Sequence, residues 1–342
     1  MANEVYVKEL ELTKADFVSD QMVKWCPGCG DHAILASFLK ALPQLGHKKE
    51  DIVVVSGIGC SSRFPYYVKT YGFHGIHGRA AALASGIKIT NPKLNVWMVT
   101  GDGDSLAIGG NHFIHVLRRN LDINIMLFNN RIYGLTKGQY SPTTPLGQVT
   151  KTSPQGTIEH PFNPGELAIG AQGTFFARVT DTNPKLMTEI MVEASKHKGT
   201  SLIEFLQNCV IFNNKTFQEI TSREAKVENQ IYLKAGEPMI FGKESDKGIV
   251  LDGTKLMVVK LGENGVTEKD LLIHNPYETD PGIHIMLAKM APPEFPAAIG
   301  VIRSVDNLSY DEQVEAIIEH EKEVSPIHSV TDLLNSGKTW EI

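Results

Sequence analysis

Two polar stretches decide the fold of this chain: Val-Thr-Gly-Asp-Gly-Asp at residues 99–104 and Asn-Asn-Arg-Ile-Tyr-Gly-Leu-Thr-Lys-Gly-Gln at residues 129–139. Each stretch follows a short apolar run that is typical of a buried strand, and a helical pattern lies between them. The first stretch places a carboxylate on a glycine turn, and the second supplies two amides. Together they outline a site for a metal ion and a diphosphate.

The same alternation of strand and helix continues on both sides of these stretches. Apolar, β-branched runs bounded by turn residues predict strands at residues 52–55, 95–100, 123–128, 174–179 and 201–206. Helical patterns separate most of them, at residues 79–88, 111–119, after Pro164 and after Asn183. This order predicts an α/β fold, a doubly wound parallel sheet with helices on both faces.

The chain divides into three predicted parts. Residues 1–25 form an extended arm that is too polar to contribute to a core, and residues 26–215 form the binding domain, whose first helix, 33–42, is capped by Asp31. Residues 216–342 form a mixed extension that shields the site and contacts a partner. Within it we predict helices at 223–234 and 310–323 and hairpin-like strands across 239–261.

Composition excludes several classes of protein. The 342 residues are 42% hydrophobic, enough for a large core, and the formal charge of -6 comes without the clustered basic patch that nucleic-acid binding needs. No apolar run reaches the roughly 18 residues of a membrane span. The polar start resembles neither a secretory signal nor a transit peptide, so we expect a cytoplasmic enzyme.

Ligands of open α/β sheets bind beyond the carboxyl ends of the strands, where the polar loops of this chain gather. Asp102 supplies a hard oxygen of the kind that Mg²⁺ prefers, and glycines beside it let a diphosphate approach the backbone. The amide of Asn130 and the carbonyl of Ile132 follow the next strand. These three oxygens are predicted to ligate Mg²⁺, with two diphosphate oxygens and a water completing the shell.

Four cysteines in a reducing compartment are expected to be metal ligands or buried hydrophobes, not disulfides. Cys26 and Cys29 form a chelating pair, while Cys60 and Cys209 follow distant strands that end at the same edge of the sheet. Four thiolates from scattered loops fit a [4Fe-4S] cluster. The spacing leaves zinc open as an alternative.

Taken together, these motifs resemble a known family. Gly-Asp-Gly followed by Asn-Asn is similar to the signature of thiamine-diphosphate enzymes. In order along the chain, the set resembles the β subunit of the 2-oxoacid:ferredoxin oxidoreductases: Trp-Cys-Pro-Gly-Cys-Gly-Asp-His (25–32), Gly-Ile-Gly-Cys-Ser-Ser (57–62), His-Gly-Arg-Ala (77–80), Gly-Asp-Gly-Asp (101–104) and Tyr-Gly-Leu-Thr-Lys-Gly-Gln (133–139). The resemblance is strong over residues 15–215 and loose beyond them.

The resemblance implies a reaction and its cofactors. The reaction is oxidative decarboxylation of a 2-oxoacid with coenzyme A, giving an acyl-CoA, CO₂ and reduced ferredoxin. The cofactors are thiamine diphosphate, Mg²⁺ and a [4Fe-4S] cluster on Cys26, Cys29, Cys60 and Cys209. The implied cofactor-binding residues are Gly59, Cys60, Ser61, His77, Gly101, Asp102, Gly103, Asp104, Asn130, Gly134, Leu135 and Thr136.

Substrate contacts and partners follow from the same resemblance. His77, Lys137 and Arg63 are the predicted catalytic residues, and the Leu135-Thr136-Lys137 run resembles the version in 2-oxoglutarate or broad-range 2-oxoacid enzymes. The family's activating glutamate and most of its coenzyme A site belong to an α subunit. We therefore predict that the chain is inactive alone and works as a heterodimer or a dimer of heterodimers.

Three other interpretations remain. The substrate is pyruvate or a broad range of 2-oxoacids in the first. In the second, the chain is a non-oxidative thiamine-dependent decarboxylase or synthase with structural zinc. In the third, it is an electron-carrier or scaffold subunit that binds no thiamine.

Overall fold

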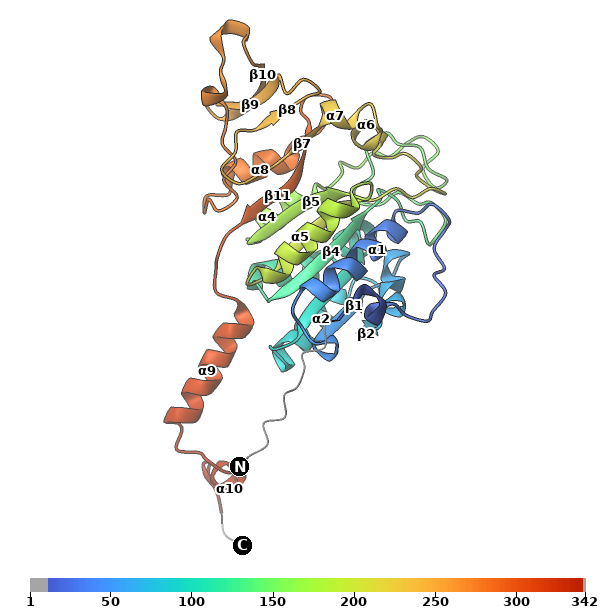
Figure 1. Cartoon of the computed structure of the whole chain (residues 1–342). Coiled ribbons are helices and arrows are strands. Elements are labelled where there is room, and N and C mark those ends of the chain that lie inside the picture. Colours follow the sequence, from blue (N-terminus) through green and yellow to red (C-terminus); the bar gives the residue numbers. More distant parts are fainter. Residues whose placement is uncertain (1–11, 341–342) are drawn as a thin grey trace, which may run out of the picture.

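The five predicted strands form the centre of one sheet in the computed structural model, which describes residues 12–340 (Figure 1). They are β1 (Ile52–Ser56), β3 (Asn95–Gly101), β4 (Ile123–Asn129), β5 (Phe175–Thr180) and β6 (Ser201–Leu206). All residues of β4, β5 and β6 are buried, as expected of parallel strands covered on both faces. The predicted α/β class is confirmed.

Three more strands extend this sheet at its two edges. They are β2 (Tyr71–His74), β7 (Gln230–Tyr232) and β11 (Ala297–Ser304). The order is β2-β1-β3-β4-β6-β5-β11-β7, and β11 runs antiparallel to β5. The predicted parallel sheet is confirmed for the strands within residues 52–206, and the antiparallel strand β11 belongs to the mixed C-terminal part. The hydrophobic pattern of the sequence did not predict β2, because three of its four residues are exposed and it contains Gly72 and His74.

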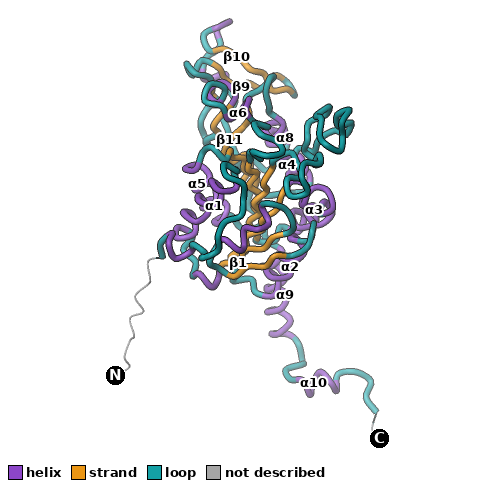
Figure 2. The backbone as a smooth tube through the Cα atoms, turned by 90° about the vertical axis from the view of Figure 1, so that its right-hand side faces the viewer, coloured by secondary structure: helices purple, strands orange, loops and turns teal. Residues whose placement is uncertain are grey.

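Helices cover both faces of the sheet, as predicted (Figure 2). On one face lie α1 (Asp31–Ala41) and α5 (Pro184–Lys196), whose apolar side chains join one buried core. The other face is covered by α2 (Ala80–Thr90), α3 (Gly110–Arg119), α4 (Pro164–Gly170) and α8 (Gly282–Lys289), which share the second core. The two layers leave the carboxyl ends of the strands open to loops.

Two expectations about the first 42 residues are wrong. Residues 1–11 lie outside the described part, but Phe17 follows in a short 3-10 helix and is fully buried in the core beneath α1. The polar arm therefore contributes two core residues, Phe17 and Trp25, which a pattern of isolated apolar positions does not reveal. Asp31 is also not the cap of α1: it is the first residue of the helix, and its buried side chain makes no capping bond.

The C-terminal part mixes confirmed and wrong expectations. The hairpin segments form a second, antiparallel sheet of β8 (Ile240–Phe241), β9 (Lys247–Asp252) and β10 (Lys255–Lys260). The helix predicted at 223–234 is wrong. Only α6 (Gln218–Thr221) and α7 (Lys226–Asn229) are helical nearby, because residues 230–232 pair with β11 instead. The boundary at residue 215 stays a prediction.

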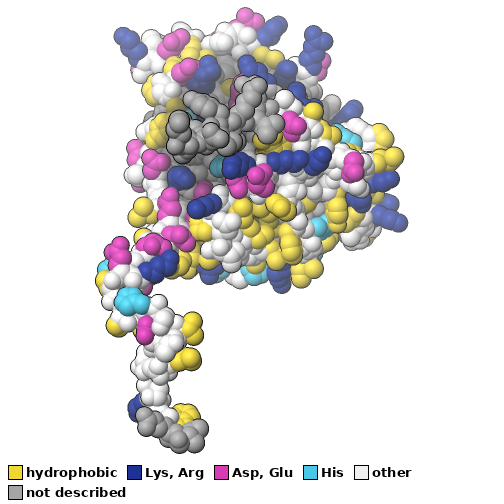
Figure 3. Space-filling model, turned by 60° about the horizontal axis from the view of Figure 1, so that its bottom comes forward, with side chains coloured by type: hydrophobic (Ala, Val, Ile, Leu, Met, Phe, Trp, Pro, Cys, Tyr) yellow, Lys and Arg dark blue, Asp and Glu magenta, His cyan; other side chains and the backbone are white. Residues whose placement is uncertain are grey.

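The acidic helix is present as α9 (Tyr310–Val324) and projects from the body together with α10 (Val330–Asn335) (Figure 1). Figure 3 shows Asp and Glu side chains gathered where this arm leaves the body, with hydrophobic side chains farther along it. Ser309 caps α9 by accepting a hydrogen bond from the backbone N–H of Glu312. None of the helices in residues 12–340 is both long and apolar enough to cross a membrane.

Candidate active site

The loops that follow β1, β3 and β4 meet at one edge of the sheet. Their contacts are close enough that side chains would not fit at some positions. A Cβ at Gly103 would run into the ring of Tyr133, whereas a Cβ at Gly101 would make only an ordinary contact, 3.6 Å from Oγ of Ser61. Gly103 therefore lets the loop after β3 approach the segment after β4 closely.

Asp102 lies at the centre of this edge and is 2% exposed. Its Oδ2 accepts hydrogen bonds from Oγ of Ser141 at 2.5 Å and from Oγ1 of Thr143 at 2.6 Å. Burial raises the pKa of Asp102 above its ordinary value, and the two hydroxyls oppose this shift. The carboxylate is thus held by neutral groups in a place where a cation would strongly favour its charged form.

The side chains of the amide pair at the end of β4, Asn129 and Asn130, point in two directions, because consecutive residues at a strand end face opposite sides. Asn130 donates from Nδ2 to Oε1 of Gln207 at 2.8 Å, and its Oδ1 accepts from the backbone N–H of Ile132 at 3.2 Å. Asn129 donates from Nδ2 to Oε1 of Glu204 at 2.7 Å. Ligation of Mg²⁺ by Asp102, Asn130 and Ile132 stays a prediction.

Asp104 begins a π-helical turn (Asp104–Ile108), a feature frequent at functional sites, and is 3% exposed. Its Oδ1 lies 2.6 Å from Nδ1 of His77 and accepts from the backbone N–H groups of Gly78 and Ile58 at 2.7 and 3.1 Å. Oδ2 accepts from Oγ1 of Thr100 at 2.8 Å. The carboxylate predicted to bind cofactor thus joins three loops and orients a histidine.

All four cysteines line one cavity of about 240 Å³, together with Trp25. Nε1 of Trp25 donates to the carbonyl of Cys60 at 2.6 Å, and Gln207 reaches Sγ of Cys29 at 3.3 Å. A Cβ at Gly134 would lie 3.5 Å from Sγ of Cys209 and 3.6 Å from Sγ of Cys60. The fold therefore gathers the predicted cluster ligands from three segments.

Burial determines the acidity of this cavity. It raises the pKa of the Cys60 thiol to about 12, with the nearby Asp31 carboxyl as the second cause, and it raises the pKa of Cys29 in the same way. The pKa of Asp31 itself is raised to about 7, mainly by burial. Bare thiolates are disfavoured here, whereas a bound metal deprotonates a thiol.

No three Cys, His, Asp or Glu side chains within residues 12–340 converge on the position of a single metal ion. The cysteines line a cavity instead of closing on one point. Ligation of a [4Fe-4S] cluster by the four cysteines stays a prediction, with zinc as the alternative.

The predicted substrate residues fall into two places. Lys137 and Arg63 line the cysteine cavity, as does Leu135. Lys137 has a left-handed φ of 78°, unusual for a residue other than glycine. His77 lies apart from them, with its ring 6.3 Å from that of Tyr133. Thr136, next to Lys137 in the chain, lies at the surface, where its hydroxyl donates to Oε1 of Gln139.

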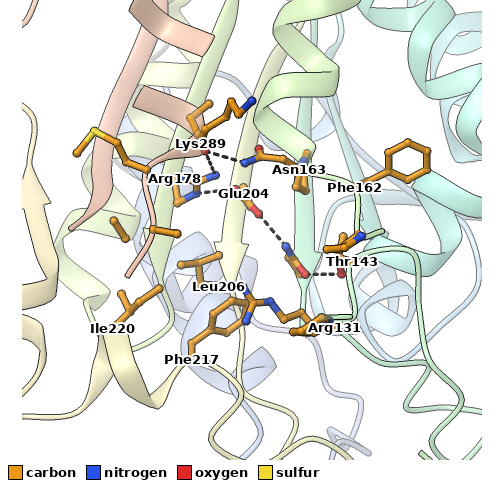
Figure 4. Close-up of a pocket in the computed structure, with 18 residues that line it drawn as sticks. Arg131, Thr143, Phe162, Asn163, Arg178, Glu204, Leu206, Phe217, Ile220 and Lys289 are labelled. Atoms are coloured by element: carbon orange, nitrogen blue, oxygen red, sulfur yellow. Dashed lines mark hydrogen bonds and ion pairs between the residues drawn. The ribbon is translucent and has the colours of Figure 1, made fainter. Parts of the chain in front are cut away.

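Figure 4 shows a second cavity, whose volume is also about 240 Å³. The two adjacent amides line different cavities: Asn129 lines this one, and Asn130 lines the cysteine cavity. A buried ion pair joins Nε of Arg178 to Oε2 of Glu204 at 2.7 Å, and Nη2 of Arg178 donates to the carbonyl of Ala288 at 3.0 Å. Through Asn129 this pair is connected to the edge that carries Asp102.

Several residues at the site carry no sequence signal. Ser141 and Thr143 contact Asp102 from a long loop. Gln207, which follows β6, contacts Asn130 and Cys29. None of the three belongs to a recognisable motif. The chain from β4 to α4 forms no helix or strand, and loops of this length inside a compact domain are usually functional. Which of its hydroxyls turn inward depends on tertiary contacts alone.

Comparison with known proteins identifies the domain that carries this edge. The family described as "Thiamine pyrophosphate enzyme, C-terminal TPP binding domain" matches residues 57–205. This range runs from the loop after β1 to the end of β6, and it includes Asp102, Asn130 and Cys60. The chain contains a thiamine-diphosphate-binding domain.

Relatives extend the match to nearly the whole chain. The 2-oxoglutarate oxidoreductase subunit KorB of Mycobacterium tuberculosis is 44% identical over 330 residues, 96% of this chain and 88% of the relative. The 2-oxoglutarate synthase subunit KorB of Archaeoglobus fulgidus is 46% identical over 197 residues, 57% of this chain and 73% of the relative.

A solved structure agrees with the fold. It is a 2-oxoglutarate:ferredoxin oxidoreductase from Magnetococcus marinus with 2-oxoglutarate, coenzyme A and succinyl-CoA bound. Its TM-score is 0.76 at 28% identity, over 99% of this chain and 100% of that chain. The chain therefore belongs to the KorB family, the thiamine-diphosphate-binding β subunits of the 2-oxoacid:ferredoxin oxidoreductases.

Proposed function

We propose that this chain is the β subunit of a 2-oxoglutarate:ferredoxin oxidoreductase. The complex converts 2-oxoglutarate and coenzyme A to succinyl-CoA and CO₂ and passes two electrons, one at a time, to ferredoxin. The observation that carries the proposal is the cavity in which four cysteines meet Asn130 and Lys137, residues of the segment that follows β4. This shared cavity supports a proposal in which the electron acceptor lies beside the decarboxylation site.

Mg²⁺ is held by Asp102, the amide oxygen of Asn130 and the carbonyl oxygen of Ile132. The fit rests on Asp102, a buried carboxylate whose side-chain partners, among the described residues, are two hydroxyls and no cation. A buried carboxylate without a positive partner is destabilising, and a divalent ion removes that penalty. When bound, thiamine diphosphate supplies the electron sink for loss of CO₂ from the 2-oxoacid.

The [4Fe-4S] cluster is held by Cys26, Cys29, Cys60 and Cys209. Trp25 covers one side of their cavity, and its hydrogen bond to Cys60 fixes the backbone that carries one ligand. Cys₄ ligation is the common mode for such clusters. When bound there, the cluster would supply one-electron chemistry between the substrate site and ferredoxin.

The remaining predicted residues act on the substrate and the thiamine diphosphate. Lys137 pairs with the distal carboxylate of 2-oxoglutarate, Arg63 meets its other carboxylate, and His77 contacts the cofactor or the reacting atoms. Lys137 and Arg63 share the cysteine cavity, which supports a substrate site beside the cluster.

An α subunit completes the site. It supplies the activating glutamate and most of the coenzyme A contacts, and residues 216–342 of this chain shield the cluster and contact that subunit. The chain alone is accordingly inactive.

The test is anaerobic purification of the chain with its partner subunits, followed by iron, zinc and thiamine analysis. Reduction of a viologen dye is then measured with 2-oxoglutarate and with pyruvate, each with and without coenzyme A. We expect four irons per chain if one cluster is present, bound thiamine, and CoA-dependent turnover faster with 2-oxoglutarate.

Other outcomes would each contradict a specific part. Zinc without iron would favour the non-oxidative decarboxylase, and equal turnover of pyruvate would favour the broad-range enzyme. Full activity of an Asp102→Ala complex would favour a subunit that binds no thiamine. Turnover by the isolated, cluster-loaded chain at the rate of the complex would remove the need for the α subunit.

A further inference from the structure

Two hydroxyls from the long loop between β4 and α4 converge on a single oxygen of Asp102. Oγ of Ser141 and Oγ1 of Thr143 lie 2.5 and 2.6 Å from Oδ2. No side chain of residues 12–340 donates a hydrogen bond to the other oxygen, Oδ1. All three residues are at most 4% exposed. The carboxyl group is therefore fixed in rotation, with Oδ2 engaged by the two hydroxyls.

The hydroxyls are themselves fixed by the loop. Oγ1 of Thr144 accepts from the backbone N–H of Ser141 at 2.7 Å and donates to the carbonyl of Arg131 at 2.8 Å. Thr144 thus ties the loop to the segment after β4, where Asn130 and Ile132 lie. The loop and the proposed cation ligands form one connected unit.

Thr143 has a second acceptor beside it. Its Oγ1 lies 2.9 Å from Oδ1 of Asn129, and Oδ1 is the acceptor end of that amide because Nδ2 donates to Glu204. Dashed lines in Figure 4 follow this chain of contacts to Arg178. A hydroxyl carries one proton, and a charged carboxylate is the stronger acceptor. With a cation bound, the proton of Thr143 goes to Asp102.

We propose that Ser141 and Thr143 are positioning residues that hold the Asp102 carboxylate in the orientation that binds the divalent cation of the thiamine diphosphate site. Hydrogen bonds to a ligating carboxylate set its direction, and loss of such a partner typically lowers metal affinity about 10- to 100-fold. The proposal rests on the proposed function, because it takes Asp102 as the cation ligand.

The test measures cation affinity in the complex of the full chain with its partner subunits. Thiamine diphosphate binding is followed by equilibrium dialysis while Mg²⁺ is titrated, and the half-saturating Mg²⁺ concentration is recorded. For Thr143→Val and Ser141→Ala we expect that concentration to rise about 10- to 100-fold. Thr143→Ser keeps the hydroxyl and should stay close to the wild type. At saturating Mg²⁺ the kcat of each variant should recover.

A matched control separates positioning from packing. Thr200 is also fully buried, and its hydroxyl donates to the carbonyl of Leu121 at 2.7 Å, but it precedes β6 at the opposite end of the strands. Thr200→Val should lower thermal stability without changing the Mg²⁺ dependence. If Thr143→Val matched Thr200→Val in both measurements, the positioning role would be wrong.

Failure of this inference is distinguishable from failure of the proposed function. Asp102→Ala should abolish Mg²⁺-dependent thiamine diphosphate binding. If it does so while Thr143→Val and Ser141→Ala bind Mg²⁺ normally, the cation site stands and the positioning role falls. If Asp102→Ala also binds normally, the proposed cation site itself is wrong.

Discussion

Nδ1 of His77 lies 2.6 Å from Oδ1 of Asp104, although the two residues belong to loops after different strands. A carboxylate only accepts hydrogen bonds, so Nδ1 carries the proton and donates it. In the neutral imidazole, Nε2 then keeps its lone pair free for an acceptor role. His77 is 38% exposed by its side chain while Asp104 is buried, so the pair presents one defined face of the imidazole to the site.

This pair gives a prediction for Asp104→Asn. The amide can keep Oδ1 toward His77 and place Nδ2 against Thr100, whose hydroxyl turns to accept, so the variant removes charge and little else. We expect normal thiamine and iron contents with kcat/KM for 2-oxoglutarate lowered about 100-fold, the low end of the range for loss of a positioned proton-transfer group. Asp104→Ala should lose cofactor as well. Unchanged kcat/KM in Asp104→Asn would contradict a role for the carboxylate charge.

Gly57 supplies a second test of the contacts around Asp104. A Cβ at this position would run into the carboxylate of Asp104, which cannot move without breaking its bonds to Ile58 and Gly78. Gly57→Ala should therefore destabilise the chain by about 1–3 kcal/mol, the typical cost of overpacking. Urea unfolding measures the change.

Gly86→Ala is the matched control for Gly57→Ala. Gly86 lies within α2 with open space where a Cβ would go, so alanine should stabilise the chain by about 0.5–1 kcal/mol through its helix propensity. Equal effects of the two substitutions would show that the contact with Asp104 does not matter.

The central fold was predictable from sequence because its signals are local. Buried strands such as β4 appear as continuous apolar runs, and Asn183 and Pro184 mark the start of α5 by capping chemistry. The strands at the edges were not predictable in the same way. The short β7 takes part of a segment with a helical pattern, because pairing with β11 outweighs its local preference.

The residues of the candidate site were likewise predictable only where the signal is local. Cysteines, glycines and Asp102 were found because their residue types and spacing carry chemistry in themselves, and the fold brings the four cysteines to one cavity. Partners such as Thr143 and Gln207 are common polar residues whose role depends on a contact across the fold. Asp104 was identified from its motif, but the motif does not show that its carboxylate accepts hydrogen bonds from four groups of the chain.

Lys137 tests the choice of substrate. If its ammonium pairs with the distal carboxylate of 2-oxoglutarate, Lys137→Met removes a charge-assisted hydrogen bond of about 1.5–3 kcal/mol. The ratio of kcat/KM for 2-oxoglutarate over pyruvate should then fall about 10- to 100-fold. Lys185, an exposed residue of α5, provides the control Lys185→Met, which should leave the ratio unchanged. An unaltered ratio in Lys137→Met would assign selection to other residues.

His197 predicts how stability depends on pH. The imidazole is buried against Thr174, and burial lowers its pKa from 6.5 to about 4. The unfolded chain binds a proton below pH 6.5, whereas the folded chain does so only near pH 4. Stability from the neutral ring is thus complete above pH 6.5 and is lost as pH falls toward 4, by about 3 kcal/mol in all.

Urea unfolding of the wild type and of His197→Gln at pH 7.5 and pH 5 measures this loss. The glutamine variant does not titrate, so the difference in unfolding free energy between the two proteins should shrink by about 2 kcal/mol at the lower pH. Other groups titrate equally in both proteins and cancel in the comparison. A difference that stays constant from pH 7.5 to pH 5 would mean that His197 takes up its proton as easily in the folded chain as in the unfolded one.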